Sequence, residues 1–197
     1  MTVKLERVNG EQIRPWVNAV AGLRIQVFRE WPYLYDGNMN YEAQYLETYI
    51  RSPHSVLVLA RDGDQVVGAA TGLPLEDEED AFIQPFVDQG YDPASIFYFG
   101  ESVLLPAFRG QGIGVRFFAE REAHARQLGG FRYCCFCAVE RPADHPLRPK
   151  DHKPLDDFWK NRGYEPVPAL RTHYPWKDID EAEETAKSMN FWMAELG

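Results

Sequence analysis

The sequence predicts an α/β fold of the α+β kind, in which helices flank one central sheet. Strand-like segments with alternating or continuously apolar residues occur between segments whose apolar residues recur at helical spacing. The run 96–105 is nearly continuously apolar, as expected for a strand buried on both faces, and a glycine-rich loop leads from it into a helical segment. The chain of 197 residues shows no repeat and no composition break, so we expect one domain spanning residues 1–197.

The first half of the chain is expected to contain two helices and a hairpin. Its predicted elements are a strand at 3–8, a helix at 13–28, a loop at 31–40, a second helix from about residue 41, and strands at 55–60 and 66–71. Pro15 is tolerated because it lies near the start of a helix. The second helix places Tyr41, Tyr45 and Tyr49 on one face. The pair Asp62-Gly63 is a typical hairpin turn.

The second half is expected to alternate strands and helices. Its predicted elements are an excursion at 73–95 with a helical part near 82–87, a strand at 96–105, a helix at 115–128, a strand at 131–139, a short helix at 155–161, and closing strands at 170–176 and 189–196. Pro106 ends the long apolar strand, and Gly129-Gly130 ends the longer helix. Gly163 ends the short helix in the same way.

Charge and composition exclude several classes of function. The formal net charge is −9, and a nucleic-acid binder would need a basic surface to replace phosphate counterions. No stretch approaches the roughly 20 apolar residues of a membrane helix. Residues 1–10 are polar and lack the apolar core of a signal peptide. An odd, clustered set of cysteines is a poor disulfide framework, so we expect a reducing, cytoplasmic location without nucleic-acid or membrane partners.

The cysteines Cys134, Cys135 and Cys137 raise the question of a zinc site with His145 or His152. On a strand, Cys135 and Cys137 share one face and Cys134 takes the other, so the three thiols cannot converge. The Cys-x2-Cys spacing of zinc sites is also absent. We therefore interpret them as core residues and expect no metal.

The loop Arg109-Gly110-Gln111-Gly112-Ile113-Gly114 is the strongest candidate for a binding site. Its glycines allow a ligand to approach the backbone, and the helix that follows offers unpaired N–H groups to an anion such as a pyrophosphate. A dinucleotide-binding motif would need glycine where Val115 stands, and a P-loop would need Lys-Ser/Thr after Gly114. A plain tight turn between strand and helix is the alternative.

At this loop the chain resembles the GNAT acetyltransferase superfamily. The family pattern Gln/Arg-x-x-Gly-x-Gly/Ala is matched by Arg109, Gly112 and Gly114, and the order of predicted elements is similar along almost the whole chain. The resemblance implies a mixed, mostly antiparallel sheet with a V-shaped cleft for acetyl-CoA between the fourth and fifth strands. It also implies direct attack of an amine on the thioester, without a covalent enzyme intermediate.

The resemblance implies which residues contact acetyl-CoA. Backbone amides of the loop and of the first helical turn would hold the pyrophosphate, while the end of the fourth strand would pair with the pantetheine and polarise the thioester. The residues concerned are Val103, Leu104, Leu105, Arg109, Gly110, Gln111, Gly112, Ile113, Gly114 and Val115. Trp159 is expected to pack against the thiol arm.

Glu101 is the candidate catalytic base. Many family members carry a glutamate at this place on the fourth strand, and a lysine-like amine of pKa about 10.4 must lose a proton before it attacks. The alternative is that Glu101 is a paired structural carboxylate. Family members often protonate the leaving thiolate with a tyrosine, but Trp159 occupies that position here and indole is no acid. His152 likewise replaces the family's frequent asparagine.

Several features have two interpretations that the sequence does not separate. His145 and His152 belong either to a solvated loop or to an acceptor-side wall, and the acidic run 76–80 is either solvated or borders the cleft. The aromatic residues Trp31, Tyr33, Tyr35 and Tyr41 lie where family members place the acceptor, and they could equally form core or homodimer contacts.

The sequence thus predicts an acetyl-CoA-dependent N-acetyltransferase that acts on a primary amine of a small molecule or peptide. The runner-up is a non-catalytic acyl-CoA-binding or sensor module, suggested by Trp159 in place of tyrosine. A nucleotide-binding oxidoreductase is disfavoured, because the glycine loop lacks the dinucleotide pattern. The identity of the acceptor does not follow from the sequence.

Overall fold

In the computed structural model, which describes residues 3–197, eight strands form one sheet in the order β1-β2-β3-β4-β6-β8-β7, and β5 pairs with β3. The strands are β1 (Lys4–Val8), β2 (Val56–Asp62), β3 (Gln65–Pro74), β4 (Ile96–Tyr98), β5 (Ser102–Leu104), β6 (Tyr133–Val139), β7 (Glu165–Trp176) and β8 (Thr185–Glu195). The α-helices are α1 (Val17–Phe28), α2 (Met39–Arg51), α3 (Asp80–Asp88), α4 (Ile113–Leu128) and α5 (Asp156–Lys160).

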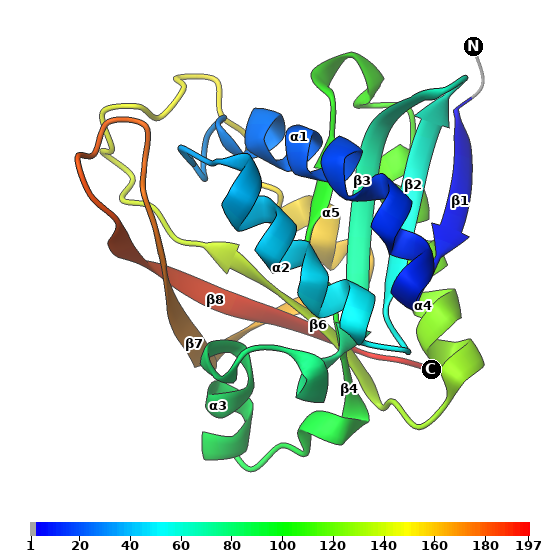
Figure 1. Cartoon of the computed structure of the whole chain (residues 1–197). Helices are drawn as coiled ribbons and strands as arrows, with labels where there is room; N and C mark the ends of the chain where they lie inside the picture. The colour runs from blue at the N-terminus through cyan, green and yellow to red at the C-terminus, as the bar shows by residue number, and fades with distance from the viewer. Residues whose placement is uncertain (1–2) are drawn as a thin grey trace.

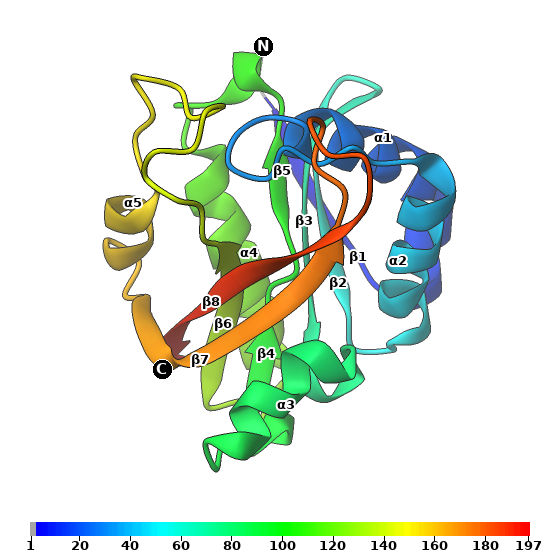
Figure 2. The same ribbon diagram turned by 90° about the vertical axis from the view of Figure 1, so that its left-hand side faces the viewer.

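The sheet separates two hydrophobic cores. Figure 2 shows α4 and α5 on one side of the strands and α1 and α2 on the other. Alternation along β2 explains the division, because Leu57 and Leu59 face the α1–α2 side while Val56 and Val58 face α4. The apolar faces predicted for the helices therefore pack against the sheet. Figure 1 shows α1 and α2 in front of the sheet and α4 and α5 behind it.

The sheet is mixed and mostly antiparallel, as the resemblance implied. Among the described strands only β4 and β6 pair in parallel, with Tyr98 opposite Cys135. The helix α4 makes the crossover that a parallel pair requires. The N–H of Phe99 donates to the Cys135 carbonyl over 2.8 Å, and beyond this residue the segment that continues into β5 diverges from β6. This divergence opens the V-shaped cleft between the predicted fourth and fifth strands.

The predicted continuous strand at 96–105 is wrong in one respect: it is broken into β4 and β5. Thr71 of β3 faces two residues, because its carbonyl accepts from Gly100 N–H over 3.2 Å and its N–H donates to the Glu101 carbonyl over 3.1 Å. Two residues opposite one define a β-bulge, which bends the strand and redirects its side chains. The apolar pattern does not reveal such a single inserted residue.

Two further boundaries differ from expectation. The helix predicted at 13–28 begins as a 3-10 helix at Gly10–Trp16 and becomes α-helical only from Val17. The closing strands are longer than predicted, since β7 starts at Glu165. The added part of β7 contains Pro166 and Pro168, which a strand tolerates here because β7 lies at the edge of the sheet. Within residues 3–197 no helix is long and apolar enough to cross a membrane.

Candidate active site

A cleft lies where β5 and β6 diverge. Its residues come from the bulge, from α4, from β6, from α5 and from the end of α1. They are Phe28, Pro32, Tyr33, Phe99, Gly100, Glu101, Ser102, Gly114, Phe118, Arg121, Phe136, Cys137, Ala138, Val139, Leu155, Phe158 and Trp159. The cleft therefore brings together three of the predicted site residues: Glu101, Gly114 and Trp159.

The glycine-rich loop has the backbone that an anion site requires. Gly110 and Gly112 adopt φ values of 74° and 78°, a left-handed conformation that side chains disfavour. A Cβ atom on Gly112 would meet nothing within 4 Å, so the space beside this backbone is open. The α4 helix begins at Ile113, and its first N–H groups have no acceptor within the helix. The positive end of the helix thus faces open space next to the cleft.

The remaining predicted coenzyme residues occupy two different environments. Val103 is fully buried in the core on the α1–α2 side and does not line the cleft. The side chain of Arg109 turns back to the protein, where it donates to the Leu104 carbonyl over 3.0 Å and pairs with Glu30 at 3.0 Å. Arg109 therefore braces the loop against β5 and α1. The family resemblance had implied only a backbone contact between Arg109 and the pyrophosphate, so this role of the side chain was not predicted.

The bulge is held by a buried arginine that sequence analysis did not identify. The guanidinium of Arg121 donates to the carbonyls of Thr71 and Glu101, each over 3.1 Å, and to the Ser102 hydroxyl over 2.8 Å. Its charge also lies over the Phe99 ring, 4.1 Å from the centroid. Burial lowers the pKa of Arg121 to about 10. Each of these carbonyls already accepts from a backbone N–H across the bulge, so Arg121 is its second donor and fixes the backbone that carries Glu101.

A second pocket adjoins the cleft and is lined mainly by aromatic side chains. Its residues are Arg24, Phe28, Tyr33, Tyr35, Tyr41, Tyr45, Phe82, Tyr98, Gly100, Glu101, Cys137, Tyr174, Trp176 and Met189. Tyr33 and Glu101 line both the cleft and this pocket. Of the four aromatic residues that the sequence left ambiguous, Tyr33, Tyr35 and Tyr41 border this pocket. Trp31 lies instead against His145 and His152, at centroid distances of 5.2 and 5.8 Å.

Glu101 is paired, as its alternative interpretation supposed. Its Oε2 lies 2.7 Å from Arg24 Nη1, and both side chains are at most 8% exposed. Arg24 also pairs with buried Glu42, so the cluster holds one cation and two anions. Within residues 3–197, the buried Oε1 of Glu101 has no hydrogen-bond partner. A buried carboxylate oxygen without a donor is exceptional, and this one lies at the junction of cleft and pocket.

The other oxygen of Glu101 ends a chain of hydrogen bonds. Tyr45 donates to Glu101 Oε2 over 3.0 Å, the hydroxyls of Tyr45 and Tyr49 lie 3.1 Å apart, and Tyr49 lies 3.1 Å from Glu78 Oε1. Burial raises the pKa of Glu78 to about 7. Of the acidic run 76–80, four residues are exposed, as the solvated interpretation supposed, and only Glu78 is half-buried.

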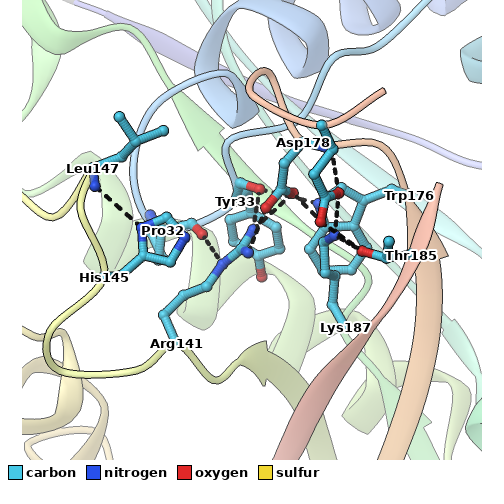
Figure 3. Close-up of polar contacts among 10 residues, drawn as sticks. Pro32, Tyr33, Arg141, His145, Leu147, Trp176, Asp178, Thr185 and Lys187 are labelled. Atoms are coloured by element: carbon cyan, nitrogen blue, oxygen red, sulfur yellow. Dashed lines mark hydrogen bonds and ion pairs between the residues drawn. The ribbon is translucent and has the colours of Figure 1, made fainter. Parts of the chain in front are cut away.

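The loop between α1 and α2 is clamped over the site. Figure 3 shows Arg141 pointing from the end of β6 between this loop and the β7–β8 turn. Its guanidinium donates to the carbonyls of Pro32 and Tyr33 over 2.7 and 2.6 Å, and it pairs with Asp178 at 2.5 Å. Trp176 Nε1 also donates to the Tyr33 carbonyl over 3.0 Å. These contacts place the ring of Tyr33 at the boundary of both cavities.

The three cysteines occupy the positions expected of core residues. Cys135 and Cys137 belong to the core on the α1–α2 side and Cys134 to the other, and all three are buried and free. Burial raises the pKa of Cys134 and of Cys137 to about 12. Among residues 3–197 there is no group of three or more His, Cys, Asp or Glu side chains able to hold a metal ion.

Solved acetyltransferase structures share this fold. The Arabidopsis thaliana NAA60 structure in complex with acetyl-CoA is 13% identical, with a TM-score of 0.63 over 98% of both chains. The ribosomal-protein-alanine N-acetyltransferase of Brucella melitensis is 14% identical, with a TM-score of 0.62 over 98% of this chain and 99% of its own. The acetyl-CoA complex of yncA, a putative acetyltransferase from Salmonella typhimurium, is 9% identical, with a TM-score of 0.58 over 100% of this chain and 95% of its own.

These solved structures show the fold that this chain shares with acetyltransferases. The sequence profile of the Acetyltransferase (GNAT) family matches residues 24–149, which is more than half of the chain. This chain belongs to that family. Among curated protein sequences none matches it. The predicted resemblance is thus confirmed at the level of family and fold.

Proposed function

We propose that this protein transfers the acetyl group of acetyl-CoA to a primary amine. The observation that carries the proposal is Glu101, whose buried Oε1 lacks a donor at the junction of the two cavities. One cavity is bordered by the glycine-rich loop and the other by aromatic rings. A carboxylate between them suits a proton transfer at the point where coenzyme and acceptor meet.

Acetyl-CoA fits the cleft on two grounds. The open backbone at Gly112 and the α4 N-terminus would bind the pyrophosphate through N–H groups and the helix dipole. The edge of β5 that faces β6 carries no strand partner among the described residues, so its backbone would pair with the pantetheine arm. Trp159 lies half-buried in the cleft, 4.9 Å from the ring of Trp192, and would pack against the thiol end.

The reaction then needs no covalent enzyme intermediate. Glu101 Oε1 takes a proton from the ammonium group, the neutral nitrogen attacks the thioester carbonyl, and the C–S bond breaks. The second proton that the nitrogen loses ends on the thiolate of coenzyme A. At neutral pH the first deprotonation of a lysine-like amine requires roughly 4 kcal/mol, which a nearby carboxylate reduces by accepting the proton directly.

The aromatic pocket favours a small amine with an apolar or aromatic body. Its charged members are Arg24, which two carboxylates already neutralise, and Glu101. Aromatic faces attract a cation, and the excess of negative charge in the cluster acts in the same direction. A peptide amine remains the second form of acceptor to test, since the pocket contacts only the part of the acceptor near the nitrogen.

The test is thiol release from acetyl-CoA with a panel of arylalkylamines, aliphatic diamines, lysine and short peptides. We expect saturable turnover with at least one small amine that carries an aromatic or apolar body. Tight binding of acetyl-CoA without turnover of any member would instead support the non-catalytic module. Hydrolysis in the absence of amine supplies the background rate.

Trp159 gives a separate prediction about the leaving group. A phenol can protonate a thiolate whereas indole cannot, so Trp159→Tyr is expected to raise kcat. The matched control is Trp159→Phe, which also shortens the ring system but adds no proton donor. Steady-state kinetics should show a higher kcat for Trp159→Tyr than for Trp159→Phe at unchanged KM for acetyl-CoA. Equal kcat values for these two variants would show that protonation of the thiolate does not limit turnover.

A further inference from the structure

The chain of hydrogen bonds from Glu101 to Glu78 contains too few protons to be complete with both carboxylates ionised. Four groups are joined by three contacts: Glu101 to Tyr45 at 3.0 Å, Tyr45 to Tyr49 at 3.1 Å, and Tyr49 to Glu78 at 3.1 Å. Each contact needs one proton, and the two hydroxyls supply two. Three simultaneous hydrogen bonds therefore require a third proton, which one of the two carboxyl groups can hold.

The surroundings of the chain decide which carboxyl group holds this proton. Glu101 contacts the guanidinium of Arg24 at 2.7 Å, which stabilises the carboxylate. Within residues 3–197 no cation is among the groups that shift the pKa of Glu78, and burial raises this pKa to about 7. The other charged or titratable groups that act on the two ends of the chain are Asp77, Glu79, Tyr98, Cys135 and Cys137 near Glu78, and Glu42 and Arg121 near Glu101. These surroundings favour a carboxylate at Glu101 and a shared proton on Glu78 at pH values below about 7.

Amide formation from an ammonium ion produces one proton more than the coenzyme can keep. The nitrogen of the ammonium ion carries three protons and the amide nitrogen carries one, so two are lost. One ends on the coenzyme A thiol. The other must leave the buried Glu101, whose side chain is 1% exposed, before the next turnover.

We propose that Tyr45, Tyr49 and Glu78 form a relay that carries this proton from Glu101 to the surface. This inference rests on the proposed function and adds three residues that act through Glu101. Glu78 is only half-buried, so it can release its proton to solvent. The hydroxyls of Tyr49 and Tyr45 then turn, and the carboxyl group of Glu101 rotates so that its protonated oxygen faces Tyr45. A proton passes from Glu101 to Tyr45 as Tyr45 and Tyr49 pass theirs on, and Glu78 is protonated again.

The β-bulge holds the relay in place. A Cβ atom on Gly100 would lie 1.8 Å from the Tyr49 hydroxyl and 2.6 Å from Thr71 Oγ1. Only glycine therefore leaves room for the Tyr49 hydroxyl against the backbone of the bulge. The same bulge positions Glu101. One local irregularity thus places both the base and the middle of its relay.

The kinetic test compares Glu78→Gln and Tyr49→Phe with the wild type. The amide that Glu78→Gln introduces would still donate to Tyr49, so the hydrogen bonds persist while proton release stops. Tyr49→Phe interrupts the chain. We expect kcat to fall by about a hundredfold in both, the lower end of the usual contribution of acid–base catalysis, with KM for acetyl-CoA unchanged. Imidazole, a small diffusible proton acceptor, should restore kcat in both variants and leave the wild type unaffected.

The matched control is Tyr164→Phe. It removes a tyrosine hydroxyl that donates to Glu122 over 3.0 Å, on the other side of the sheet. We expect this variant to keep the wild-type kcat and to show no imidazole effect. A wild-type kcat in Glu78→Gln, or a lowered kcat in Glu78→Gln that imidazole does not restore, would overturn the relay.

An infrared measurement tests the shared proton without any acceptor. The unliganded wild type should show the carbonyl stretch of a protonated carboxyl group that titrates near pH 7, and Glu78→Gln should lack it. Absence of this band in the wild type overturns the relay whatever activity the protein has. A wild type that shows the band but turns over no amine contradicts the proposed function instead.

Discussion

Glu101→Gln is expected to lower turnover by roughly 10²- to 10⁴-fold, the usual contribution of general base catalysis. The amide keeps the shape of the side chain and can still accept from Tyr45, but it cannot take a proton from the acceptor. Affinity for acetyl-CoA should barely change, since the proposed contacts to the coenzyme are made by the backbone. Steady-state kinetics and calorimetric titration measure the two quantities.

The pH dependence identifies the cause of the loss. At high pH the amine deprotonates without help, so the difference between Glu101→Gln and the wild type should shrink as the pH approaches the pKa of the acceptor. A change of structure alone would lower turnover equally at all pH values. Turnover equal to that of the wild type at neutral pH would eliminate Glu101 as the base.

The ion pair with Arg24 requires its own control. Glu42→Gln removes the other buried carboxylate that pairs with Arg24, while Arg24 keeps its contact with Glu101. Glu42→Gln and Glu101→Gln therefore each leave the buried Arg24 with one carboxylate partner. We expect Glu42→Gln to retain most of the wild-type turnover, because Glu42 lines neither cavity. A loss as large as that of Glu101→Gln would assign the effect to the ion pair rather than to proton transfer.

Gly112→Val is expected to lower the affinity for acetyl-CoA by at least about a hundredfold. The side chain would fill the open space beside the loop, where nothing lies within 4 Å of an added Cβ atom. Hydrogen bonds to a charged group contribute about 1.5–3 kcal/mol each, and each 1.4 kcal/mol corresponds to about tenfold in affinity. Loss of two such bonds to the pyrophosphate would be sufficient. Calorimetric titration of the folded variant measures the effect.

Gly90→Val is the matched control for this variant. Gly90 follows α3, has the same φ of 78°, and likewise has nothing within 4 Å of an added Cβ atom. Both substitutions introduce the same backbone strain, but Gly90 lies outside the cleft. We expect the two variants to lose similar stability and only Gly112→Val to lose affinity. Wild-type affinity in Gly112→Val would remove the loop from the proposed coenzyme site.

Local patterns in the sequence were sufficient for the elements that depend on local chemistry. The glycines of the loop at 109–114 and the strand and helix beside it follow from backbone freedom and hydrophobic periodicity. The alternation of the cysteines across β6 follows from the geometry of a strand, and the structure confirms it. The family could be recognised from the same short loop together with the order of elements.

The acceptor side of the site could not be derived in this way. Tyr45 and Tyr49 were expected on one face of α2, because their spacing places them there, but nothing in the sequence says what that face meets. Arg24 had appeared only as part of an amphipathic helix. A buried arginine among apolar helix residues was the one available signal, since such a charge requires a partner.

The glycine loop on the coenzyme side is thus a local property of the sequence, whereas the residues around Glu101 and what they can do depend on the tertiary structure. Residue types and spacing predicted the glycine loop, and the resemblance to the family added Glu101 and the aromatic segment as candidates. Only the folded chain brings Arg24, Tyr45 and Glu78 to Glu101, because these contacts join α1, α2, the acidic run and the bulge across long stretches of sequence. The bulge itself arises from the register of β4 and β5 against β3, and hydrophobic periodicity along a single strand carries no information about the register of its neighbour.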